Sequence, residues 1–138
     1  MPALSNTYGN PLEKKLGLKN GMSVRFIHVP QDYFNLFHIP PVDLHYSEDP
    51  GIKKNFIHLF TKSKDELFVR LPQLKNEIYQ DGCLWISWPK KYSKVNTEVN
   101  GNLVREYAIQ CGLVDTKVCA VDNTWSALKL VIPLKERK

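Results

Sequence analysis

Residues 88–97 hold the side chains of this sequence that are best suited to bind a ligand. They include three lysines, a serine, a threonine and a tryptophan, and no acidic residue occurs between Asp81 and Glu98 to offset the lysines. A helix is expected to begin just after this stretch, and the free N–H groups of its first turn add to the positive potential. Ammonium, hydroxyl and N–H groups together bind anions, and a tryptophan ring can stack on a base. The predicted ligand-binding residues are Trp88, Lys90, Lys91, Ser93, Lys94 and Thr97.

A second group of polar side chains falls on an expected hairpin near the end of the chain. An aspartate and a lysine that meet across two strands contribute about 0.2–1 kcal/mol, and such a contact is more often structural than functional. For residues 88–97 the corresponding alternative is a solvated loop whose tryptophan packs in the core. The secondary candidates are Lys117, Asp122, Trp125, Ser126 and Lys129.

Motifs for nucleotide, metal or nucleophile chemistry are missing. A dinucleotide-binding fold needs glycines after its first strand so that the backbone can approach a pyrophosphate, but this sequence has Pro30-Gln31-Asp32 there. It has no Gly-x-Gly pair, no Gly-Lys-Ser/Thr and no Gly-x-Ser-x-Gly elbow, and its four histidines lack metal-ligand spacing. The sequence therefore predicts no catalytic residue, no metal site and no cofactor.

Length and composition indicate a small globular protein with a modest positive charge. The 138 residues predict one domain over 1–138, with 1–10 as a loose lead-in. The net charge of +5 is spread evenly, with an excess of +2 in residues 1–70 and +3 in residues 71–138. An even spread argues against a nucleic-acid partner. Three cysteines, no secretion signal and no long apolar run predict a cytoplasmic protein with free thiols and no membrane segment, and the oligomeric state stays open.

The hydrophobic pattern predicts strands that alternate with helices. The capping pattern of Ser63 and Glu66 predicts a helix start, and Asn96 or Thr97 is the expected cap of a later helix. Expected helices cover 11–16, 31–37, 63–80 and 99–111, and expected strands cover 23–29, 42–46, 55–61, 83–88, 113–121 and 125–132. This order predicts an α/β fold: a three-layer Rossmann-like sandwich with a mostly parallel sheet and a C-terminal antiparallel hairpin.

The expected fold points to three loops as ligand sites. In open α/β sheets, ligands bind beyond the carboxyl ends of the strands. The loops in question follow Val29, Thr61 and Trp88. The loop after Trp88 contains the lysines described above, so the predicted ligand is a small anion.

Three stretches of the sequence resemble a bacterial family known only as a domain of unknown function. They are Pro11–Lys19, the Trp-Pro-Lys-Lys motif within 85–91, and Gly112–Lys129 with its Trp-Ser-x-Leu-Lys motif. This resemblance implies a bacterial cytosolic protein and assigns no activity. The order of elements from Asp81 onward is also distantly similar to the later half of Rossmann-like methyltransferases, although their glycine-rich cofactor loop has no match after Val29.

These observations lead to one main functional hypothesis and two alternatives. The main hypothesis is a non-catalytic module that binds a small anionic or nucleotide-like ligand at residues 88–97. The first alternative is a degenerate S-adenosylmethionine-dependent methyltransferase-like enzyme with an altered cofactor loop. The second is a protein-interaction module that uses the tryptophan-containing hairpin.

Overall fold

The computed structural model describes residues 10–138 and contains one six-stranded sheet. The loose lead-in predicted for residues 1–10 lies outside the described residues, apart from Asn10. The strand order is β2-β1-β3-β4-β6-β5. All neighbours pair in parallel except β6, which is antiparallel to both β4 and β5. The strands are β1 (Ser23–Ile27), β2 (His45–Tyr46), β3 (Lys54–Phe60), β4 (Ile78–Pro89), β5 (Val114–Ala120) and β6 (Trp125–Val131).

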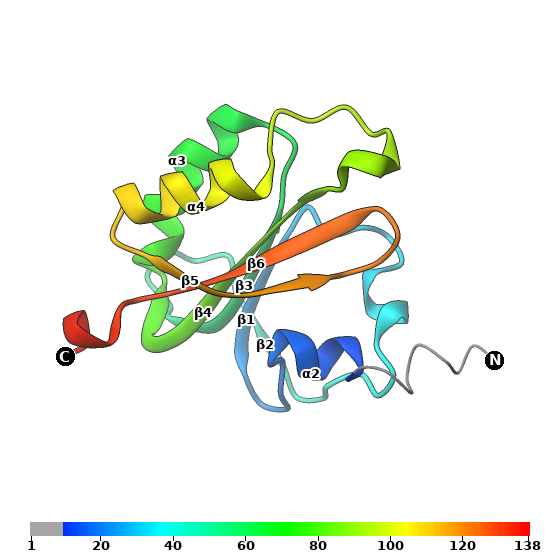
Figure 1. Ribbon diagram of the computed structural model, residues 1–138. Coiled ribbons are helices and arrows are strands. Elements are labelled where there is room, and N and C mark those ends of the chain that lie inside the picture. The colour runs from blue at the N-terminus through cyan, green and yellow to red at the C-terminus, as the bar shows by residue number, and fades with distance from the viewer. Residues whose placement is uncertain (1–9) are drawn as a thin grey trace.

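Helical elements cover both faces of this sheet (Figure 1). On one face lie α3 (Lys64–Lys75) and α4 (Gly101–Gln110), and on the other lies α2 (Leu12–Leu16). Short 3-10 turns follow β1, β4 and β6: η1 (Tyr33–Leu36), η2 (Lys91–Ser93) and η3 (Leu134–Glu136). The predicted fold class, a three-layer α/β sandwich with a mostly parallel sheet and an antiparallel hairpin, is confirmed.

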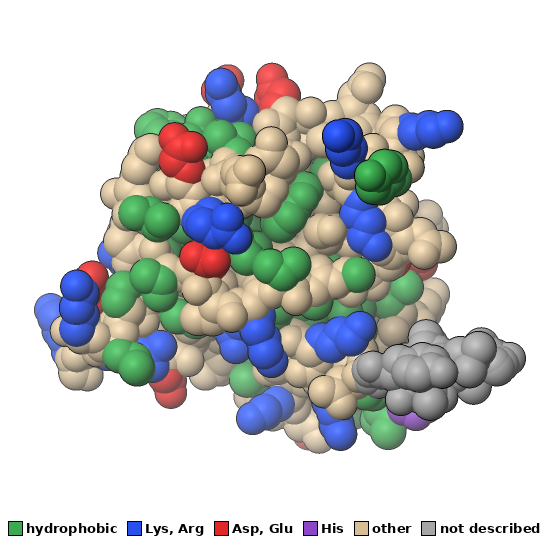
Figure 2. Space-filling view, in the orientation of Figure 1, with side chains coloured by type: hydrophobic (Ala, Val, Ile, Leu, Met, Phe, Trp, Pro, Cys, Tyr) green, Lys and Arg blue, Asp and Glu red, His purple; other side chains and the backbone are tan. Residues whose placement is uncertain are grey.

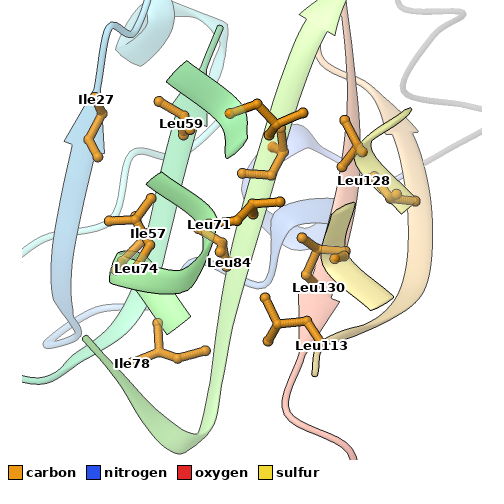
Figure 3. Packing of buried hydrophobic residues seen from close by; sticks show 14 of the residues in the cluster. Ile27, Ile57, Leu59, Leu71, Leu74, Ile78, Leu84, Leu113, Leu128 and Leu130 are labelled. Carbon is orange, nitrogen blue, oxygen red and sulfur yellow. The ribbon is translucent and has the colours of Figure 1, made fainter. Parts of the chain in front are cut away.

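The core has one hydrophobic cluster on each side of the sheet. The cluster under α3 and α4 consists of aliphatic side chains from both helices and the central strands, among them Leu71, Leu84 and Leu128 (Figure 3). The cluster under α2 is richer in aromatic residues and includes Tyr33, Phe60 and Trp85. β3 contributes to both clusters because its successive side chains point to opposite faces.

A hydrogen-bonded network lies inside the aromatic cluster. His58 Nδ1 is 2.8 Å from the Tyr33 hydroxyl, and His58 Nε2 is 2.7 Å from Ser87 Oγ. A neutral imidazole offers one donor and one acceptor, which matches two hydroxyl groups that can each play either role. Burial lowers the pKa of His58 to about 3, so this side chain is neutral in the folded protein.

A buried ion-pair cluster joins the start of β3 to the start of β4. Glu77 lies between Arg25 and Lys54, with oxygen–nitrogen distances of 2.9 Å to each, and Lys54 is fully buried. Lys54 also donates to the Asp49 carbonyl at 2.6 Å. Buried charges are tolerated when they are paired and hydrogen-bonded in this way.

Several predicted boundaries are wrong. The helix expected over 63–80 ends at Lys75, and residues 78–80 belong to β4, because Ile78 pairs with Lys54 of β3 and the strand runs on through Asp81 and Gly82. The cap of α4 is Asn100, whose side chain accepts from the Leu103 N–H, and not Asn96 or Thr97.

The elements near the amino end are shorter than expected. The strand expected over 23–29 ends at Ile27 because His28 has a left-handed backbone. The helix expected over 31–37 is only the 3-10 turn η1, and the strand expected over 42–46 is the two-residue β2. Within residues 10–138, no helix has the length and apolar character that a membrane crossing requires.

Candidate functional site

A cleft opens where β1 and β3 end. These strands lie next to each other, but the chain continues from β1 toward the β2 edge and from β3 toward the β4 side. The carboxyl ends of strands at such a reversal are the usual ligand-binding place in open α/β sheets. The cleft has a volume of about 450 Å³, and we call it the β1–β3 cleft. Its lining residues are His28, Phe60, Thr61, Lys62, Ser63, Glu66, Glu98 and Trp125.

His28 stands at the rim of this cleft in an uncommon backbone conformation. Its φ is +57°, in the left-handed region that side-chain-bearing residues rarely adopt. This conformation costs energy and persists only where the surrounding structure enforces it, often at binding sites. Its side chain is 57% exposed, so the imidazole is accessible to a ligand in the cleft.

Three side chains hold the Glu66 carboxylate in place: His28, Thr61 and Arg70, whose Nε is 3.5 Å from Glu66 Oε2. His28 Nε2 is 2.8 Å from Glu66 Oε2, and the Thr61 hydroxyl donates to Glu66 Oε1 at 2.6 Å. Partial burial opposes ionisation, but the hydrogen bonds from Thr61 and His28 outweigh it and keep the pKa of Glu66 below its usual value. Glu66 is therefore ionised at neutral pH, and its partners fix its direction.

The start of α3 explains why these groups converge. The Ser63 side chain caps the helix by accepting from the Glu66 N–H, as predicted from the capping pattern. The reciprocal half of a capping box is missing, because the Ser63 N–H donates to the Thr61 hydroxyl instead. The Glu66 carboxylate is thereby left to bind the His28 imidazole across the cleft.

The other lining residues of the cleft add aromatic rings and a second carboxylate. The rings of Phe60 and Trp125 pack edge to face with centroids 5.0 Å apart. Glu98 Oε1 accepts from the Lys64 N–H at 3.0 Å, which holds this second carboxylate beside the start of α3. The cleft-lining side chains carry two carboxylates and one ammonium group, from Lys62, so the lining has a net charge of −1 when His28 is neutral.

A smaller hollow of about 250 Å³ lies beside β1 and β2. Phe34 and Tyr46 line it together with Glu48, which follows the end of β2. Glu48 comes 20 residues after His28. In dinucleotide-binding folds an acidic residue about 20 residues beyond the first loop, after the second strand, binds ribose hydroxyls.

The predicted ligand-binding loop lies at the same edge of the sheet as the cleft. Lys90 donates its ammonium proton to the Asp122 carbonyl at 2.7 Å, so this lysine ties the loop to the hairpin. The hydroxyl of Ser93 bonds to the Lys90 carbonyl and that of Thr97 to the Val99 N–H, both within the loop. Lys91 and Lys94 are exposed.

Trp88 is half-buried and packs against the start of α4. Its Cζ2 atom lies 3.1 Å from the position that a β-carbon on Gly101 would occupy. The side chain also contacts the aliphatic cluster. Its ring therefore packs at the base of the loop. This placement resembles the alternative in which the tryptophan packs in the core and the loop is solvated.

Of the five secondary candidates, Trp125 is the one that lines the β1–β3 cleft. Asp122 accepts from the N–H groups of Thr124 and Trp125 at 2.8 Å and so shapes the hairpin turn. Trp125 lines the β1–β3 cleft, and Ser126 pairs with Trp88 across β4 and β6. Lys117 and Lys129 lie directly opposite each other on β5 and β6. Neither of these two lysines lines the cleft.

Sequence reasoning missed His28, Glu66, Glu98 and Glu48 as site residues. The rule that ligands bind beyond the carboxyl ends of strands points to the loops after Val29 and Thr61, so the sequence predicts where the β1–β3 cleft lies. None of these residues belongs to a known binding or catalytic motif. Glu66 fits a helix-capping pattern, and the left-handed backbone of His28 has no signature in the sequence.

The comparisons with known proteins concern the fold. No family model matches the chain, and no curated protein matches it. Among solved structures, it is similar to magnesium protoporphyrin IX methyltransferase from Synechocystis PCC 6803 with bound SAM, with a TM-score of 0.59, 11% identity, and 85% of this chain and 73% of that chain covered. The comparisons thus support a methyltransferase-like Rossmann fold.

Two further structures agree. An O-methyltransferase family 2 protein from Planctomyces limnophilus in complex with apigenin matches with a TM-score of 0.62 and 7% identity, over 96% of this chain and 60% of that one. A TehB-like SAM-dependent methyltransferase from Corynebacterium glutamicum matches with a TM-score of 0.52 and 11% identity, over 96% and 100% of the two chains. The predicted distant similarity to Rossmann-like methyltransferases is confirmed at the level of the fold, and the resemblance to a bacterial domain-of-unknown-function family stays a prediction.

Proposed function

We propose that this protein is methyltransferase-like and binds S-adenosylmethionine, or a ligand of the same cationic type, in the β1–β3 cleft. The observation that carries the proposal is the position and lining of the cleft: it lies at the chain reversal of a methyltransferase-like fold and presents two fixed carboxylates and a tryptophan. S-adenosylmethionine is named because structures of similar fold contain it.

The charge of the cleft suits such a ligand. S-adenosylmethionine has a sulfonium, an ammonium and a carboxylate group, which gives it a net charge of +1 at neutral pH. With histidine counted as neutral, the formal net charge of the cleft lining is −1, and Glu66 is held ionised by its partners. Cations also bind favourably over tryptophan rings, with a gain of about 0.5–2 kcal/mol. Trp125 and the two carboxylates are the groups that would hold the positive part of the ligand.

The usual backbone contacts to this cofactor do not fit. The loop after β1 has no glycine, and Pro30 has no N–H to donate. A glycine-rich loop lets the backbone come close to the ligand, whereas here His28 brings an imidazole to the same place. The proposed binding mode therefore relies on side chains, and the role of the ligand would be to supply a methyl group on its sulfonium.

Calorimetry with two ligands tests this proposal. S-adenosylhomocysteine lacks the sulfonium charge, so S-adenosylmethionine should bind more tightly, by roughly 2- to 30-fold, if the cation is recognised. Glu66→Gln should weaken S-adenosylmethionine binding and leave S-adenosylhomocysteine binding nearly unchanged. Glu106→Gln, which removes the same charge from an exposed position on α4, is the matched control. No detectable heat at millimolar ligand contradicts the proposal.

A non-catalytic anion-binding module remains the second candidate function. Lys91 and Lys94 are exposed, and neither forms an ion pair within residues 10–138. Their ammonium groups are therefore available to an anionic ligand at the predicted loop. A single-domain, cytoplasmic protein without a nucleic-acid partner also stays a prediction.

A further inference from the structure

The edge of the sheet at β5 presents backbone groups that pair with no other strand within residues 10–138. β5 is the last strand in the sheet order, so one of its sides has no neighbour among residues 10–138. The Val121 N–H bonds to the Trp125 carbonyl, toward β6. Because the backbone groups of alternate residues point the same way along a strand, Val118 and Ala120 direct their N–H and C=O groups outward. Both residues are exposed, and the Val118 side chain is 65% exposed.

A hollow of about 280 Å³ follows this edge. Four consecutive residues of β5, from Lys117 to Ala120, line it, together with Lys15 from α2 and Asn10. Consecutive residues of a strand point their side chains to opposite faces. A hollow that touches all four therefore runs along the strand edge itself, which is the place where a further strand would pair.

The surface around this edge carries positive charge without a local counterpart. Lys117 and Lys129 lie directly opposite each other, an arrangement of like charges that destabilises a sheet. Lys15 lines the same hollow as Lys117. None of these three lysines forms an ion pair within residues 10–138, and residues 1–9 contain no acidic side chain. Figure 2 shows Lys and Arg side chains gathered over the space between β5 and α2.

We propose that the free edge of β5 binds an extended segment of a partner protein in which acidic and apolar residues alternate. Addition of a strand to an exposed sheet edge is a common mode of peptide recognition, with main-chain hydrogen bonds for affinity and side chains for specificity. This interaction is independent of ligand binding in the β1–β3 cleft, because β5 contributes no residue to that cleft.

The two faces of β5 determine the alternation. Lys117 and Cys119 point to the α2 side, where Lys15 also lies. Val118 and Ala120 point to the α4 side and offer apolar surface. An added strand places its successive side chains on the same two faces, so acidic residues would meet the lysines and the residues between them would meet Val118.

Lysines on an edge strand have another common role, which is to prevent two sheet edges from aggregating. In that case the edge would repel strands of every kind, and an acidic peptide would not bind. The two explanations therefore differ in a measurable way.

The experiment uses the full chain and a fluorescently labelled six-residue peptide of alternating Glu and Val, with a Lys–Val peptide as the opposite-charge probe. Anisotropy should show binding of the Glu–Val peptide only. Val118→Pro removes an outward N–H at an edge position where proline is tolerated, and it should abolish binding. Val118→Ala keeps the N–H, so this variant should retain most of the binding of the Glu–Val peptide.

Charge reversal identifies the face that is used. Lys15→Glu with Lys117→Glu should reduce binding of the Glu–Val peptide by roughly ten-fold or more and allow the Lys–Val peptide to bind. Lys91→Glu with Lys94→Glu changes the net charge equally at a distant loop and should have little effect. Failure of the Glu–Val peptide to bind, binding that survives Val118→Pro, or equal losses in the two charge variants would each overturn the proposal.

Discussion

Acidification should destabilise this protein through the single buried side chain of His58. Burial lowers the pKa of His58 from 6.5 to about 3, because the charged imidazolium cannot be solvated inside the aromatic cluster. In the unfolded chain His58 takes up a proton near pH 6.5. The part of the unfolding free energy that depends on a neutral His58 is therefore fully present above pH 6.5, and it is lost as the pH falls toward 3.

The size of this effect follows from the difference between the two pKa values. Each unit is worth about 1.4 kcal/mol. His58 alone should remove about 3 kcal/mol of unfolding free energy between pH 7 and 4.5, and about 5 kcal/mol once the pH is below 3. These losses are a large part of the total stability of a small domain, which is about 5–15 kcal/mol.

Urea unfolding at a series of pH values measures this contribution. The His58→Gln variant loses the titration and some hydrogen bonding, so it should be less stable at pH 7, but its stability should depend less on pH. The difference in unfolding free energy between the original chain and His58→Gln should shrink by about 1.4 kcal/mol per pH unit below pH 6. His45→Gln, at an exposed position, should behave like the original chain. A difference that stays constant from pH 7 to 4 would refute the reasoning.

Three further outcomes are expected. Glu77→Gln should destabilise the fold by about 3–5 kcal/mol, measured by urea unfolding, because Lys54 loses its charged partner in a buried place. Gly17→Ala should cost only about 1 kcal/mol in the same assay, since the left-handed backbone at φ +75° is strained for alanine but a β-carbon meets nothing within 4 Å. If residues 88–97 bind anions, millimolar phosphate should raise the melting temperature, and Lys91→Ala with Lys94→Ala, which keeps the Lys90 hydrogen bond to the hairpin, should remove that rise; a rise that persists in the double variant would contradict the predicted loop.

Much of the fold could be predicted because its signals are local. The capping pattern of Ser63 and Glu66 indicated the start of α3, and the strand expected over 55–61 corresponds to β3. The boundary at Lys75 could not be predicted in this way. Residues 78–80 form a strand because β4 pairs with Lys54 of β3, a contact between distant parts of the chain that local periodicity does not contain.

The candidate site was predictable in position but not in composition. The rule for carboxyl ends of strands selects the correct edge of the sheet, where the cleft and the lysine loop both lie. His28 and Glu66 are 38 residues apart, and their contact depends on the parallel pairing of β1 with β3 and on the left-handed turn at His28. Charge clustering in the sequence favoured the lysines, because a contact formed only in three dimensions leaves no comparable pattern.

Backbone and side-chain NMR spectra recorded while S-adenosylmethionine is added test the central claim most directly. The claim predicts saturable shifts that are largest at His28, Glu66 and the Trp125 indole, with smaller changes at Lys91 and Lys94. Shifts that concentrate on residues 90–97, or spectra that do not change at millimolar ligand, would contradict the β1–β3 cleft as the binding site.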